Sequence, residues 1–136
     1  MRTKTGISIR GSRGRRDVKD PVIQFAKWLR KKHEFPIRVT VYLLPGESFT
    51  TINGDEVVAS FRWSSKSKPP YIRLATGDYS AFCKQRGKAG ALESILLSLA
   101  RQIIRYQNWC KTGKCVDTGI KSKSYEMIDE YLKEKR

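Results

Sequence analysis

The sequence predicts an α+β fold. It is expected to comprise an N-terminal helix, a three- to four-stranded and mostly antiparallel sheet, a long central helix and a C-terminal helix. Two observations carry this prediction. Apolar residues recur at helical spacing in residues 21–35 and 91–109. Between these segments, residues 37–43 alternate between apolar and polar side chains, as in a half-buried strand.

The first helix is predicted to begin at Asp20-Pro21, which supplies an N-cap followed by a proline at the first helical position. Val22, Phe25 and Leu29 then make one apolar face. The helix is expected to end before Pro36, because the residue ahead of a proline avoids helical geometry.

Four strands are predicted, over residues 37–43, 49–52, 56–63 and 71–76. Asn53-Gly54 is typical of a tight hairpin and joins the second strand to the third. Residues 80–90 are expected to form a loop.

The long helix, residues 91–109, shows a stripe of apolar side chains. The stripe consists of Leu92, Ile95, Leu96, Leu99, Ile103 and Tyr106. A final helix is expected from about Ser122.

Charge is the unusual bulk property of this 136-residue chain, which has 28 Lys and Arg against 13 Asp and Glu and a net charge of +15. Such an excess predicts attraction to polyanions, above all nucleic acid. The sequence shows neither a membrane-spanning stretch nor a signal peptide, so no membrane partner and a cytoplasmic location are expected.

Residues 1–19 are predicted to be a flexible basic arm, because they contain few apolar side chains, and residues 20–136 a single domain. Trp28, Trp63 and Tyr71 lie near basic residues and are candidates for stacking on bases, although core packing is favoured for Trp63. The predicted nucleic-acid-binding residues are Arg10, Arg13, Arg15, Arg16, Lys19, Lys27, Arg30, Lys31, Lys32, Lys66, Lys68, Lys84, Arg86, Lys88, Arg101 and Arg105; Arg62 and Arg73 belong to the same group of clusters as Lys66 and Lys68.

The three cysteines do not suggest a disulfide framework. Together with His33 they could converge on a metal, but the spacing of Cys110 and Cys115 is loose for a zinc site. Free or transiently bridged thiols are the favoured interpretation.

The end of the long helix matches the apolar and aromatic positions of a zinc-peptidase helix but lacks its metal-binding and catalytic residues. This segment reads Leu99-Ala100-Arg101-Gln102-Ile103-Ile104-Arg105-Tyr106-Gln107-Asn108-Trp109. Such a helix carries two His four residues apart and a Glu beside the first. Arg101, Arg105 and Gln102 stand at those positions. Arginine offers no lone pair to a metal, and an amide is no general base.

With the preceding segment, residues 71–77, this helix resembles the small intracellular zincin metallopeptidases over residues 21–132. The resemblance implies a third ligand, often Glu, on the following helix, where the nearest positions are Lys121 and Lys123. It therefore implies a pseudoenzyme with no catalytic residue, no metal and no cofactor.

Two functions follow. The first is binding of nucleic acid, mainly through its phosphate backbone, by the basic arm and surface. The alternative is a regulator or inhibitor that holds an acidic protein segment in the vacant cleft, with Arg101 and Arg105 as the clamp. A small charged chain of this second kind would suit a regulator encoded by a phage or mobile element.

Overall fold

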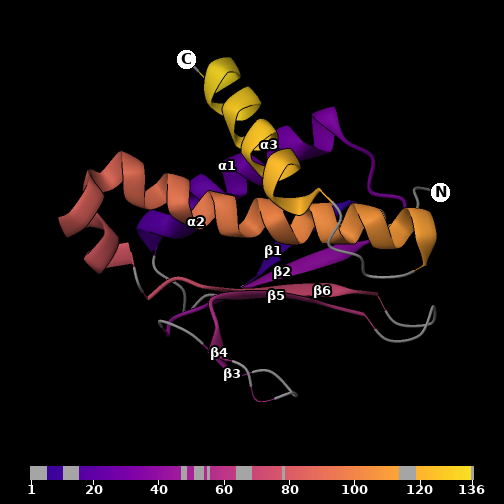
Figure 1. Ribbon diagram of the computed structural model, residues 1–136, viewed down its shortest axis with the longest axis horizontal. Helices are drawn as coiled ribbons and strands as arrows, with labels where there is room; N and C mark the ends of the chain where they lie inside the picture. Colours follow the sequence, from indigo (N-terminus) through magenta and orange to yellow (C-terminus); the bar gives the residue numbers. More distant parts are fainter. Residues whose placement is uncertain are drawn as a thin grey trace. The chain divides into compact units, whose positions relative to one another are not determined.

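The computed structural model describes residues 6–10, 16–46, 49–50, 54, 56–63, 69–77, 79–113 and 119–135 (Figure 1). The chain divides into two compact units, Met1–Asp78 and Tyr79–Arg136. The first unit holds the strands and one helix, and the second holds two helices. The α+β class is confirmed.

The first unit contains a four-stranded sheet in the order β1-β2-β6-β5. Its strands are β1 (Ile7–Arg10), β2 (Val39–Leu44), β5 (Ala59–Arg62) and β6 (Tyr71–Ala75). β1 pairs parallel to β2 and β2 pairs parallel to β6, while β5 runs antiparallel to β6. The expectation of a mostly antiparallel sheet is therefore wrong. The helix between β1 and β2 returns the chain to the same end of the sheet, which makes the pairing parallel.

β1 lies inside the segment that was expected to be a flexible arm. Ile7 is only 3% exposed and is in register with Val39. Gly6 continues the pairing, because its amide donates to Phe35 O (3.2 Å) and its carbonyl accepts from the Val39 amide (3.0 Å). Gly6 has a φ of 108°, which disfavours any residue with a Cβ atom. The prediction of an unstructured arm is thus wrong for residues 7–10, while residues 1–5 and 11–15 lie outside the described residues.

Helix α1 (Arg16–Lys32) starts one turn earlier than Asp20-Pro21 predicts, and Pro21 lies within it. Pro21 costs one backbone hydrogen bond of the helix. Burial compensates for this cost, because Val18 and Val22 are both fully buried on one face of the first turns. Phe25 and Leu29 extend that face as predicted.

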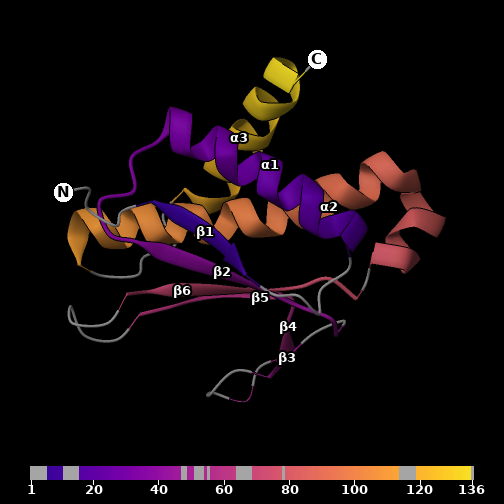
Figure 2. The same ribbon diagram turned by 180° about the vertical axis from the view of Figure 1, so that it is seen from behind.

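The two faces of the sheet differ in chemistry. One face carries apolar, buried side chains, and α1 lies along it (Figure 2). This covered face consists of Ile7, Val39, Val41, Leu43, Phe61, Ile72 and Leu74. The opposite face, called the outer face below, consists of Ser8, Arg10, Thr40, Tyr42, Ser60, Arg62, Tyr71 and Arg73.

A small ribbon of β3 (Phe49–Thr50) and β4 (Glu56–Val57) forms a second, antiparallel sheet. The strand expected over residues 56–63 is therefore divided, with a bend at Val58. The part before the bend pairs with β3, whereas the part after it, β5, pairs with β6. Residues 51–53 lie outside the described residues.

The second unit consists of α2 (Tyr79–Thr112) and α3 (Ile120–Lys135), which contact each other. The loop expected over residues 80–90 is helical except at Gly87, where φ 76° and ψ 171° kink the helix. These angles are essentially restricted to glycine. The apolar stripe of α2 is confirmed, with Leu99, Ile103 and Tyr106 fully buried. No helix in the described part of the chain is both long and apolar enough to span a bilayer.

Candidate nucleic-acid interface

The motif helix lies in α2, where Arg101 and Arg105 are half-buried and Gln102 is buried. Arg105 donates a hydrogen bond from Nη1 to Gln102 Oε1 at 3.0 Å. The Gln102 amide, at the position that the zincin resemblance assigns to a general base, thus accepts a hydrogen bond from the neighbouring guanidinium. Among the described residues, Arg101 makes no hydrogen bond or ion pair.

These residues do not fit a zinc ion. A zinc ligand must offer a lone pair, and an arginine guanidinium stays protonated and offers none. The Oε1 atom of Gln102 is already bonded to Arg105. Within the described ranges, no three His, Cys, Asp or Glu side chains are grouped closely enough to hold a metal.

Lys121 and Lys123 are exposed on α3. The buried face of α3 is made by Ile120, Ser124, Met127, Ile128 and Tyr131. At about 100° per residue, Lys121 and Lys123 fall on opposite flanks of that face. They therefore do not converge on one point, and the structure does not bring both together with Arg101 and Arg105.

The predicted cluster of Lys84, Arg86 and Lys88 spans the kink in α2. Arg86 Nη1 donates to Ser94 Oγ at 2.7 Å, and this hydroxyl donates to Gly90 O at 3.1 Å. Arg86 therefore bridges the kink from one helical segment to the next. Lys84 and Lys88 are exposed.

The basic residues of α1 lie on the helix that covers the inner side of the sheet. Lys27, Arg30, Lys31 and Lys32 are exposed, and the last three occupy the final turn. Cations at a helix C-terminus interact favourably with its exposed carbonyls. They lie on the side of the sheet opposite to the outer face, so they do not share one surface with Arg62 and Arg73, as a continuous groove would require.

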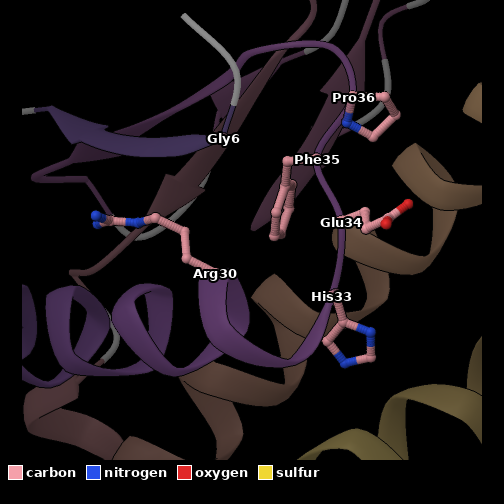
Figure 3. A pocket seen from close by; sticks show the side chains of 6 residues that line it. All are labelled: Gly6, Arg30, His33, Glu34, Phe35 and Pro36. Atoms are coloured by element: carbon pink, nitrogen blue, oxygen red, sulfur yellow. The ribbon is translucent and has the colours of Figure 1, made fainter. Parts of the chain in front are cut away.

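A hollow of about 440 Å³ opens where α1 ends, lined by Gly6, Arg30, His33, Glu34, Phe35 and Pro36 (Figure 3). Arg30 and Glu34 extend in opposite directions, with the Phe35 ring between them. The hollow thus offers groups of both signs, which does not make it selective for an anion.

The candidate stacking residues have different environments. Trp28 is half-buried and stacks on Phe25, with ring centroids 5.9 Å apart. Trp63 is 41% exposed rather than a core residue, and it stacks on Phe61 at 5.6 Å. Tyr71 is 37% exposed and lies on the outer face.

The outer face brings together residues that are far apart in the sequence. Across the strands, one row reads Arg10, Tyr42, Arg73 and Ser60, and the neighbouring row reads Ser8, Thr40, Tyr71 and Arg62. The four strands contain three arginines and no aspartate or glutamate. Because neighbouring strands lie about 4.8 Å apart, these arginines form one positive surface.

Arg73 is central to this face. Its guanidinium carbon lies 4.5 Å from the centroid of the Phe49 ring, so a cation–π contact orients the side chain. Among the described residues, its buried Nε atom has no hydrogen-bond acceptor, and the buried hydroxyl of Ser60, its register partner, has no hydrogen-bond partner.

Sequence reasoning missed Tyr42 altogether and did not connect Arg10 with Arg62 and Arg73. Their alternation along the strands was visible, but their grouping depends on the register of a parallel sheet. Among the other predicted residues, Arg16 and Lys19 belong to α1. Arg13, Arg15, Lys66 and Lys68 lie outside the described residues.

The described cysteines, Cys83 and Cys110, carry free thiols. Burial raises the pKa of the Cys110 thiol above its ordinary value, and a hydrogen bond with Tyr106 partly offsets this shift. Burial also raises the pKa of Tyr131. Both shifts favour the neutral form, so neither group adds to the charge of the second unit at neutral pH.

Comparison of the chain with protein-family models, with curated proteins and with solved structures finds no match.

Proposed function

We propose that this protein binds nucleic acid through its phosphate backbone, and that the outer face of the sheet is the main contact surface. The observation that carries this proposal is the grouping of Arg10, Arg62 and Arg73 on one face whose strands contain no acidic residue. Guanidinium groups bind phosphate oxygens with two parallel hydrogen bonds. The net charge of +15 adds a long-range attraction to any polyanion.

We also propose that the zincin-like helix has no hydrolytic activity. The support is chemical, since Arg101, Gln102 and Arg105 offer neither metal ligands nor a proton acceptor. Metal analysis of the purified protein is the direct measurement. Stoichiometric zinc would contradict this part of the proposal.

Salt dependence tests the phosphate contacts. Three contacts with a single strand predict a slope of log K against log salt of about −2, so binding should weaken roughly 20-fold between 50 and 200 mM salt. Replacing Arg10 and Arg62 by Gln should make this slope shallower by about 1.4. Binding that is equally tight at both salt concentrations would overturn the proposal.

A matched control variant removes the same two positive charges from a different surface. Lys27 and Lys31 are exposed on α1, which lies on the opposite side of the sheet. The double variant Lys27→Gln/Lys31→Gln should leave the salt slope nearly unchanged. If it instead reduces the slope as much as Arg10→Gln/Arg62→Gln, the contact surface is not the outer face.

The alternative function, capture of an acidic protein segment by Arg101 and Arg105, has weaker support. A clamp needs two guanidinium groups open to one carboxylate, whereas Nη1 of Arg105 is bonded to Gln102.

A further inference from the structure

Two tyrosines adjoin each other on the outer face. Tyr42 is 41% exposed and Tyr71 is 37% exposed, and their rings meet edge to face with centroids 6.0 Å apart. Tyr42 lies on β2 and Tyr71 on β6, so the pair occupies the two central strands of the sheet. Their aromatic surface thus remains partly open to solvent.

Each of these rings stands next to an arginine. Tyr42 lies in register between Arg10 on β1 and Arg73 on β6. Tyr71 is in register with Arg62 on β5. Residues that are direct neighbours across strands have Cβ atoms about 5 Å apart. A ring and its neighbouring arginine are therefore close enough to contact the base and the phosphate of the same nucleotide.

We propose that the outer face binds single-stranded nucleic acid, with unpaired bases stacked on Tyr42 and Tyr71 and the adjoining phosphates held by Arg10, Arg62 and Arg73. This inference rests on the proposed function and specifies its ligand. A basic groove lined with aromatic side chains is the arrangement by which proteins hold single strands without sequence preference.

The geometry favours a single strand over a duplex. In a duplex the faces of the bases are already stacked on one another, so they are not available to a tyrosine ring. Phosphate contacts alone would also require no aromatic surface. The open tyrosine pair is explained by bases that are splayed out onto the sheet, as in sheet-based RNA recognition.

The experiment compares three fluorescent probes at 50 mM salt: a 20-nucleotide oligothymidine, an abasic strand of the same length, and a 20-base-pair duplex. The oligothymidine should bind at least tenfold more tightly than the abasic strand, since each stacked base contributes about 1–3 kcal/mol and about 1.4 kcal/mol corresponds to tenfold. It should also bind more tightly than the duplex. A 20-nucleotide oligouridine distinguishes RNA from DNA as the preferred form.

Variants locate the stacking. Tyr42→Ala/Tyr71→Ala should reduce oligothymidine binding roughly tenfold or more and leave abasic-strand binding unchanged. Tyr42→Phe/Tyr71→Phe should restore oligothymidine binding, because the ring and not the hydroxyl carries the contact. Tyr125→Ala is the matched control, since Tyr125 is 47% exposed on α3 and should have no effect.

The outcomes separate the two proposals. If the wild-type protein binds the abasic strand as tightly as oligothymidine, or the duplex at least as tightly, base stacking is overturned while phosphate binding stands. If neither strand nor duplex binds at 50 mM salt, both proposals fail. The wild-type comparison of probes remains decisive even where the double alanine variant does not fold.

Discussion

Arg105 and Gln102 are joined within one turn of α2 by a hydrogen bond of 3.0 Å from Nη1 to Oε1. The bond lets a buried amide and a half-buried guanidinium satisfy each other. The hydrogen bond therefore links two of the three positions that carry the zincin resemblance.

This pair predicts a measurable coupling. Gln102→Leu and Arg105→Met should each lower the free energy of unfolding, and the double variant should lose about 1–2 kcal/mol less than the sum of the two. Urea denaturation of the four proteins measures this difference. Arg101→Met is the control, because Arg101 makes no hydrogen bond to Gln102 and its coupling to Gln102→Leu should be near zero.

Because β1 pairs with β2, Ile7 is expected to contribute to the stability of the fold, although it lies in the segment that was expected to be a flexible arm. Ile7→Ala should lower the free energy of unfolding by about 2–4 kcal/mol, because Ile7 is 3% exposed and its removal leaves a cavity. Ile37→Ala is the matched control, since Ile37 is 41% exposed and its loss should change stability by less than about 0.5 kcal/mol. Equal effects of the two substitutions would show that residues 7–10 do not pair with β2.

Replacing Gly90 by alanine is expected to destabilise the protein, although helices usually prefer alanine to glycine. A Cβ atom at Gly90 would lie 2.8 Å from Arg86 Cβ, which is too close. Gly90→Ala should therefore destabilise the protein by about 1–3 kcal/mol, although alanine normally gains about 1 kcal/mol over glycine in a helix. The thermal midpoint measures the change.

The control is Gly90→Ala made in a protein that also carries Arg86→Gly, compared with Arg86→Gly alone. Without the Arg86 Cβ the contact disappears, so Gly90→Ala should stabilise the Arg86→Gly protein. A loss of stability in that background as well would place the strain elsewhere.

Local patterns in the sequence identified most elements of the fold. The apolar face of α1, with Phe25 and Leu29, and the alternation of β2 were both visible as periodicities. β1 was missed because Ile7 and Ile9 stand among glycines and arginines, and because its partner follows only after a whole helix. Residues 80–90 were misassigned because Gly87 interrupts only one position of an otherwise helical segment.

The outer face could not be derived in the same way. Arg10, Tyr42 and Arg73 belong to one row only because β1, β2 and β6 pair parallel in a particular register. A shift by a single residue would bury Tyr42 and expose Val41 instead. Such a register is set by contacts between residues far apart in the sequence, and a local sequence pattern does not reveal them.

The order of the strands has a consequence for synthesis on the ribosome. β1, α1 and β2 are all translated before β6. However, β2 pairs with β1 on one side and with β6 on the other. At about 5–20 residues per second, the roughly 30 residues between β2 and the end of β6 take a few seconds. During that interval the edge of β2 lacks its partner, so the nascent chain passes through a stage that is open to wrong strand pairing.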